Sequence, residues 1–246
     1  MKRLPLAGKL GPDTIMSAVE RGAVEMAREG AGPVEIAGRC SAWLTEATEL
    51  AMQQFPPVRP IGCKSGCAYC CHLKVVATVP EVLCIIDHVQ RTLSPEGLAS
   101  FRARVSEANA AVGNVTADER ARRQVPCPLL DGSHCVAYEN RPLHCAGANS
   151  FDPASCEDAF RRPDEDVAIS HYPAQRLAAG SASVGLSRAL FTIGLDGRVV
   201  ELVAALHLAL TDPSAADRWN QGEPAFEAAV DRELVAMLER RRLDRG

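Results

Sequence analysis

Apolar residues recur every three or four positions over most of the chain, which is the spacing of amphipathic α-helices. Stripes of this kind predict helices over 13–29, 33–54, 80–93, 94–108, 172–193, 199–206 and 223–242. Start signals accompany some of them: we expect Asp13 to cap the first helix, and Thr78 with Glu81 to form a capping box for the third. No alternation of strands with helices and no internal repeat is visible, so the pattern predicts a mainly helical single domain.

The stretches that lack this pattern separate the expected helices. Residues 54–62 hold three prolines and cannot be helical throughout. Residues 74–78 alternate weakly, which predicts a short strand, and the polar, arginine-rich stretch 113–124 predicts an exposed linker. We therefore expect N-terminal helices over 1–59, a cysteine-cluster region over 60–160, and C-terminal helices over 161–246 that pack on the same core.

Length and composition suit a chain with a sizeable core. It has 246 residues, 47% of them hydrophobic, with a formal net charge of -4 and a pI of about 5.9. This charge provides no basic field for nucleic acid. The start of the chain lacks an apolar run of signal-peptide length, and no segment approaches the roughly 20 apolar residues of a membrane span. We expect a cytoplasmic protein without nucleic-acid or membrane partners, and the residues identify no protein partner.

Cysteine is the residue that changes this picture. Eight of the ten cysteines lie in two loop-like segments, the first of which reads C-K-S-G-C-A-Y-C-C-H. These eight are Cys63, Cys67, Cys70, Cys71, Cys127, Cys135, Cys145 and Cys156, the last on a short helix that Asp152 can cap. Cytoplasmic thiols stay reduced, and thiols at this density are typical metal ligands. We predict that the eight converge in space as a metal-binding knob formed by the two loops.

The other two cysteines are expected to be structural. Cys40 falls on the apolar stripe of the helix 33–54, where it fits a small core residue. Cys84 and His88 stand four residues apart on one helix, which is ligand spacing, but no second pair completes a site. We expect neither cysteine to bind metal.

The first segment can direct three thiols at one centre. The spacing C-x3-C-x2-C allows this if Gly66 takes a positive φ in a tight turn. The adjacent Cys70 and Cys71 have Cβ atoms directed apart, so two centres would use both thiols, whereas one centre would leave thiols in reserve. Four thiolates around zinc or an oxidised cluster carry a net double negative charge. Nearby residues that can compensate this charge are Lys64, His72, Lys74, Arg141 and His144, and His72, His134 or His144 can also replace a thiolate.

The order of these residues resembles a known family. C-x3-C-x2-C-C-H is followed by C-P-x-L at 127–130, a further cysteine, Y-E-x-R-P at 138–142 and a cysteine at 145. This is similar to the YkgJ-type cysteine-cluster family, also called the CxxCxxCC family, over roughly residues 60–150. That family is described as a zinc- or iron-chelating domain, so the resemblance implies that the first seven of the eight cysteines are metal ligands. We add Lys64, Tyr138 and Arg141 as residues expected to contact the bound group.

The chain departs from the family pattern in two places. The first gap has three residues where two are common, and Ala146 follows Cys145 where an arginine is common. The family pattern implies ligands without naming a reaction.

Three functions are compatible with this pattern. The favoured one is a metal-binding protein that holds zinc or an iron–sulfur cluster such as [4Fe-4S]. An enzyme is the less favoured interpretation: C-x3-C-x2-C with Tyr69 before the third thiol also matches the radical S-adenosylmethionine signature, but that signature belongs to strand–helix barrels. The third is an interaction module whose loops are held together by zinc. We assign no catalytic residue.

Overall fold

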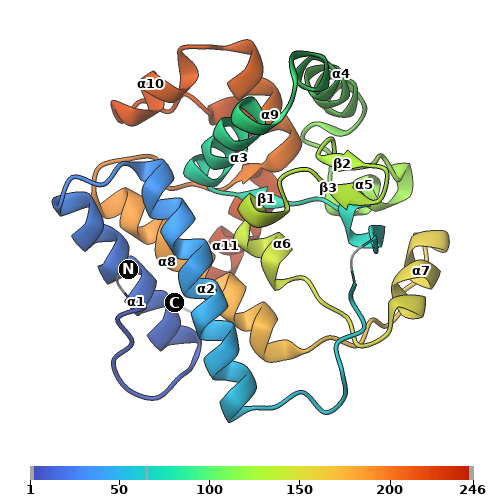
Figure 1. Ribbon diagram of the computed structural model, residues 1–246, viewed down its shortest axis with the longest axis horizontal. Coiled ribbons are helices and arrows are strands. Elements are labelled where there is room, and N and C mark those ends of the chain that lie inside the picture. The colour runs from blue at the N-terminus through green and yellow to red at the C-terminus, as the bar shows by residue number, and fades with distance from the viewer. Residues whose placement is uncertain (1–2, 65, 244–246) are drawn as a thin grey trace.

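The computed structural model describes residues 3–64 and 66–243, with side chains up to Met237, and over these residues the chain is mainly helical (Figure 1). The α-helices of the described chain are α1 (Pro12–Arg28), α2 (Pro33–Gln54), α3 (Val79–Thr92), α4 (Pro95–Val112), α5 (Ala117–Arg123), α6 (Leu143–Gly147), α7 (Pro153–Arg161), α8 (Pro173–Thr192), α9 (Leu202–Thr211), α10 (Ala215–Asn220) and α11 (Arg232–Leu243). Short 3-10 turns lie at η1 (Tyr69–His72), η2 (Tyr138–Asn140) and η3 (Glu227–Ala229). The predicted mainly helical fold class is confirmed.

Helices α1, α2 and α8 pack closely together on one side of the molecule (Figure 1). Small residues allow this approach: a Cβ placed on Gly185 of α8 would lie 2.5 Å from the carbonyl oxygen of Met16 in α1. In the same way, Gly22 of α1 faces the buried ring of Trp43 in α2. The predicted helix that Pro33 opens is confirmed with the same bounds, Pro33–Gln54.

The other side of the core is built from α3, α4 and α9, and a single carboxylate fixes where α3 begins. Oε2 of Glu81 accepts hydrogen bonds from the amide and the hydroxyl of Thr78, at 2.6 and 2.7 Å, as the predicted capping box requires. Oε1 of the same side chain accepts the amide of Leu143 at 2.8 Å, which ties α6 to α3. Ser94 and Asp152 cap α4 and α7, and the predicted cap at Asp152 is thereby confirmed.

Two short antiparallel pairs interrupt the helical pattern. The predicted strand near 74–78 is present as β1 (Val76–Ala77), and it pairs with β4 (Val200–Glu201). The second pair is the hairpin of β2 (Leu130–Asp131) and β3 (His134–Cys135).

Two predicted helices begin later in the structure than expected, because β4 and its neighbours make extended backbone contacts. The helix expected from residue 199 begins at Leu202, because the two residues before it are held in the strand pair. The continuous last helix expected over 223–242 is also wrong. Val230 bridges to Val200, and the amide of Asp231 donates to the carbonyl of Val199, so the chain is extended there and α11 starts afterwards.

Two further expectations fail for local reasons. The stretch 113–124 is not a linker: Thr116 and Glu119 form a capping box that starts α5, and the helix ends at Gln124, which takes a left-handed φ of 51°. The first helix is not capped by Asp13, which lies within α1. Its N-cap is Gly11, whose amide donates to the Thr14 hydroxyl at 2.9 Å.

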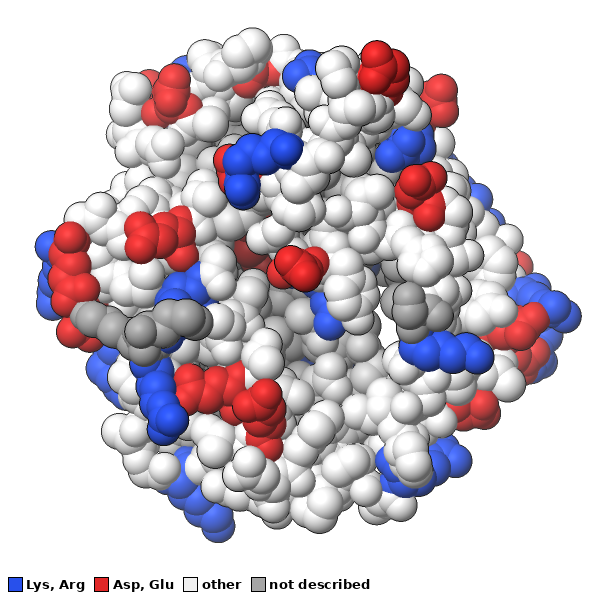
Figure 2. Space-filling view, viewed as in Figure 1, with Lys and Arg blue, Asp and Glu red and all other residues white. Residues whose placement is uncertain are grey.

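Within the described chain, no helix is both long enough and apolar enough to cross a lipid bilayer. Acidic and basic side chains are interspersed over the face shown in Figure 2, where no large patch of one sign is seen. The boundaries at residues 59 and 160 stay predictions.

Candidate metal centre

The two cysteine segments lie side by side although more than fifty residues separate them. The amide of Cys127 donates to the carbonyl of Cys71 at 2.8 Å, at the end of the first segment. At its beginning, the amide of Gly62 donates to the carbonyl of Ser150 at 2.9 Å, and the amide of Ser150 donates to the sulfur of Cys63 at 3.2 Å. The fold therefore joins the segments at both ends of the first loop, with η1 near the hairpin β2–β3 and α7 (Figure 1).

Local chemistry shapes the first loop as expected. Gly66 has a φ of +85°, in the left-handed region that a side chain would strain, and the amide of Cys67 donates to the carbonyl of Lys64 at 3.1 Å. The chain then enters η1, where Tyr69, Cys70, Cys71 and His72 form one 3-10 turn. This confirms the predicted turn at Gly66.

The second segment presents its cysteines from several short elements. Cys135 lies on β3, opposite Leu130 of β2, and Cys145 lies on α6. Cys156 lies on α7, which packs on η1 through Phe160: its ring centroid is 5.8 Å from that of Tyr69 and 4.7 Å from that of His72. The 3-10 turn and helix α7 therefore approach each other through an aromatic contact.

The thiols divide into two groups according to which neighbouring thiols raise the pKa of each. We call Cys63, Cys67 and Cys156 the outer thiols, and Cys71, Cys127, Cys135 and Cys145 the inner thiols. Desolvation raises the pKa of Cys63, and the neighbouring thiols at positions 67, 156 and 70 raise it further. Burial likewise raises the pKa of Cys145, and the thiols at 127, 70 and 135 add to it. Cys70 acts on the pKa of members of both groups.

A hydrogen bond between the adjacent thiols of Cys70 and Cys71 shifts their pKa values in opposite directions. A hydrogen bond from the Cys71 thiol lowers the pKa of Cys70 to about 7, with help from Arg141, while the same hydrogen bond and burial raise the pKa of Cys71. Burial raises the pKa of Cys127 to about 12. The inner thiols are therefore protonated near neutral pH unless a bound cation displaces their protons.

The donor types fit zinc or an iron–sulfur cluster, but the ligand geometry is not formed in this structure. All ten cysteines are free thiols. In the described part of the chain, no group of three or more histidine, cysteine or acidic side chains is arranged to hold a metal ion as it stands. The structure thus brings the segments together and leaves the eight-cysteine ligand set a prediction.

Of the other predicted contacts, Arg141 affects the pKa of three of the thiols, those of Cys70, Cys135 and Cys145. Its guanidinium stacks on the half-exposed ring of Tyr138, 4.1 Å from the ring centroid. Burial raises the pKa values of Cys135 and Cys145, and the positive charge of Arg141 acts against this rise. Lys64 is exposed, and its positive charge likewise acts against the rise in the pKa of Cys67.

Lys74, which was expected to compensate thiolate charge, is engaged elsewhere. Its Nζ lies 2.8 Å from Oδ2 of Asp231 and donates a hydrogen bond of 2.8 Å to Glu233. Among the candidate histidines, Nδ1 of His72 lies 3.2 Å from the carbonyl oxygen of Ala68, and burial lowers the pKa of His144. His134 is exposed on β3.

Cys40 and Cys84 occupy structural positions. Cys40 is fully buried in α2. The thiol of Cys84 donates to the carbonyl of Val34 at 3.1 Å, and Nε2 of His88 lies 3.1 Å from the carbonyl oxygen of Val136. These contacts engage the side chains in helix packing.

One residue near the inner thiols escapes sequence reasoning. Arg120 of α5 is only 2% exposed, and its Nε and Nη1 have no hydrogen-bond partner among the described residues. The groups whose charge acts on it are Glu201, itself buried, and Cys127. The capping signal at residues 116–119 could have placed Arg120 on a helix, but nothing in the sequence indicates that it is buried.

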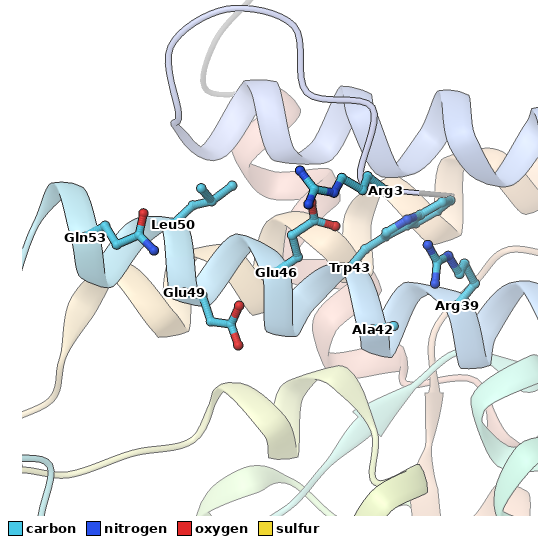
Figure 3. A pocket seen from close by; sticks show the side chains of 8 residues that line it. All are labelled: Arg3, Arg39, Ala42, Trp43, Glu46, Glu49, Leu50 and Gln53. Carbon is cyan, nitrogen blue, oxygen red and sulfur yellow. The ribbon is translucent and has the colours of Figure 1, made fainter. Parts of the chain in front are cut away.

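Two hollows of the described chain are lined by residues other than the eight clustered cysteines. A groove of about 410 Å³ on α2 is shown in Figure 3, where Arg3 reaches over the helix towards Glu46 beside Trp43. A second, largely apolar hollow of about 680 Å³ lies among α1, the end of α2 and the start of α8, with Phe55 and Tyr172 on its wall. None of the eight cysteines lines either hollow.

Comparison with protein-family models, curated proteins and solved structures finds no match to this chain.

Proposed function

We propose that this protein binds a metal centre, zinc or an iron–sulfur cluster, through thiolates of the two cysteine segments. The observation that carries the proposal is the junction of those segments. The amide of Cys127 donates a hydrogen bond to the carbonyl of Cys71, and the amide of Ser150 donates one to the sulfur of Cys63, across gaps of more than fifty residues. The two joined segments carry eight free cysteines, and thiolates are the donors that these metals prefer. The resemblance to the YkgJ-type pattern supports the same proposal.

The division of the thiols favours two sets of ligands. The inner thiols supply four sulfurs, which is the number that a structural zinc ion or a cluster takes. The outer thiols together with Cys70 supply another four. This division assigns the adjacent Cys70 and Cys71 to different ligand sets, although their thiols are hydrogen-bonded to each other in this structure. When bound, zinc would hold the loops together, and a cluster would add the capacity to carry an electron.

Metal and sulfide analysis of protein purified without oxygen tests the proposal. Stoichiometric iron with acid-labile sulfide and visible absorbance identifies a cluster, and colourless protein with stoichiometric zinc identifies a zinc site. Cys71→Ser and Cys145→Ser should lower the metal content, because each removes an inner thiol. Cys63→Ser and Cys156→Ser test the outer set in the same way.

Cys40→Ser and Cys84→Ser serve as matched controls, since they remove thiols that are engaged in helix packing. The proposal fails if folded wild-type protein takes up neither metal under reducing conditions. It also fails if the inner-thiol variants retain the full metal content.

A further inference from the structure

The side chain of Arg120 is buried without the partners that a buried cation needs. Helix α5 carries three arginines in its second half, and two of them behave as surface residues: Arg122 pairs with Asp164 at 2.6 Å, and Arg123 with Glu119 at 3.7 Å. Arg120 is the one buried residue of the helix. Two of its guanidinium nitrogens lack an acceptor within the described chain, which is costly for a charged group shielded from water.

Two groups near Arg120 are candidates for the missing hydrogen-bond acceptor. Glu201 is buried nearby, but its Oε2 accepts the amide of Ala204 at 2.7 Å as the cap of α9. The other group close enough to act on Arg120, once it is deprotonated, is the thiol of Cys127, seven residues along the chain. A neutral thiol is a weak acceptor, whereas a metal-bound thiolate is a strong one.

The proposed function supplies that acceptor, and the inference rests on it. Four thiolates around one zinc ion or oxidised cluster leave a net double negative charge, and a buried centre needs hydrogen-bond donors and cations around its sulfurs. We infer that Arg120 is a positioning residue for the inner thiols: its guanidinium donates hydrogen bonds to the metal-bound thiolate of Cys127 and offsets the charge of the centre.

The test measures metal affinity rather than activity. Reduced, metal-free full-length protein is titrated with Zn²⁺ in competition with a chromophoric chelator. Arg120→Met, which keeps the length of the side chain without its charge, should weaken binding about tenfold or more, as loss of an outer partner of a metal ligand does. Arg120→Lys restores the charge and should recover part of the affinity. Arg122→Met, on the exposed side of the same helix, should leave the affinity unchanged.

Stability of the metal-free protein separates this role from an ordinary structural one. If Arg120 serves the loaded centre, Arg120→Met should not lower the denaturation midpoint of metal-free protein, because its donors are unsatisfied there. A structural ion pair with Glu201 would instead lower that midpoint in metal-free and loaded protein alike, and this result would overturn the inference. The double variant Arg120→Met/Glu201→Gln removes both charges, and it should fold and still bind Zn²⁺ more weakly than Glu201→Gln alone.

The outcomes distinguish the two proposals. Wild-type protein that binds Zn²⁺ with the same affinity as Arg120→Met would overturn the inference and leave the proposed function standing. Wild-type protein that takes up neither zinc nor iron would overturn both.

Discussion

The backbone amide of Cys127 donates a 2.8 Å hydrogen bond to the carbonyl of Cys71. This contact places the start of the second cysteine segment against the end of the first. Because it involves backbone atoms, it does not depend on the protonation of either thiol. The chain can therefore keep its two cysteine segments adjacent while the inner thiols are still protonated.

Removal of the metal should loosen the cysteine region and spare the helices around α8. Ligands come from both segments, so their release removes restraints between Gly62 and Cys156. Helices α1, α2 and α8 have their own apolar contacts and should persist. Hydrogen exchange of loaded and metal-free protein should show faster exchange over 62–156 alone. Complete loss of the helical circular dichroism signal would contradict this prediction.

Cys40→Ala and Cys84→Ala should leave the metal content unchanged. Both changes remove a small buried or half-buried side chain, and each should lower the free energy of unfolding by about 1–2 kcal/mol. Burial raises the pKa of Cys84 to about 11, so its thiol stays protonated and bonded to Val34 at neutral pH. Metal analysis and urea denaturation check the two expectations, and a loss of metal in either variant would place that cysteine in the centre.

Two glycines of α8 should respond in opposite directions to the same substitution. A Cβ at Gly185 would lie 2.5 Å from the Met16 carbonyl and 2.9 Å from Cβ of Val19, so Gly185→Ala should force α1 and α8 apart and cost about 1–3 kcal/mol. Gly180 has open space, and Gly180→Ala should stabilise the helix by about 1 kcal/mol. Thermal denaturation of both variants checks the pair. Equal effects of the two substitutions on thermal stability would show that α1 and α8 can accommodate a methyl group at Gly185.

Loss of the Lys74 cation should destabilise the fold at neutral pH. Lys74→Met leaves the Asp231 carboxylate, which is 2% exposed, without its ion pair, and a buried unpaired charge costs about 3 kcal/mol. Glu233→Gln changes the half-exposed partner and should cost less than about 1 kcal/mol. Chemical denaturation of the two variants measures the difference.

The pH dependence of the same pair has a definite sign. Burial alone would lower the pKa of Lys74, but the two carboxylates outweigh it and raise the pKa above the ordinary value of 10.5. A raised lysine pKa in the folded state adds stability below the unfolded pKa, and this stability is lost as the pH rises through the folded value. The difference in the free energy of unfolding between wild type and Lys74→Met should therefore narrow above pH 10.5. A difference that widened above this pH would contradict the assigned pairing.

Sequence patterns predicted the features that local chemistry decides. The helix Pro33–Gln54 and the box at Thr78 and Glu81 follow from spacing and capping residues within a few positions, and both are present. The pairing of β4 with β1 could not be predicted, because a two-residue strand is determined by a partner more than a hundred residues away. That pairing also explains why α9 begins at Leu202, and the bridge between Val200 and Val230 explains why α11 begins only at Arg232.

The same limit applies at the candidate centre. Spacing indicated which cysteines to consider, and the turn at Gly66 followed from residue type. The run of arginines at 120–123 suggested a solvated stretch, and Arg122 and Arg123 do lie at the surface. Arg120 lies on the same helix but on its buried face, which charge composition does not reveal.

Glu81 engages both of its oxygens, one with the start of α3 and one with the amide of Leu143 at the start of α6. Cys145 stands two residues beyond that amide, so the last inner thiol is anchored to a buried helix of the core. Cys156 is carried instead by a short helix with no buried residue, held to η1 by an aromatic contact. Cys145 is thus tied to the buried core, whereas Cys156 rests on a short surface helix, so we expect the side of the proposed centre that carries Cys156 to move more readily.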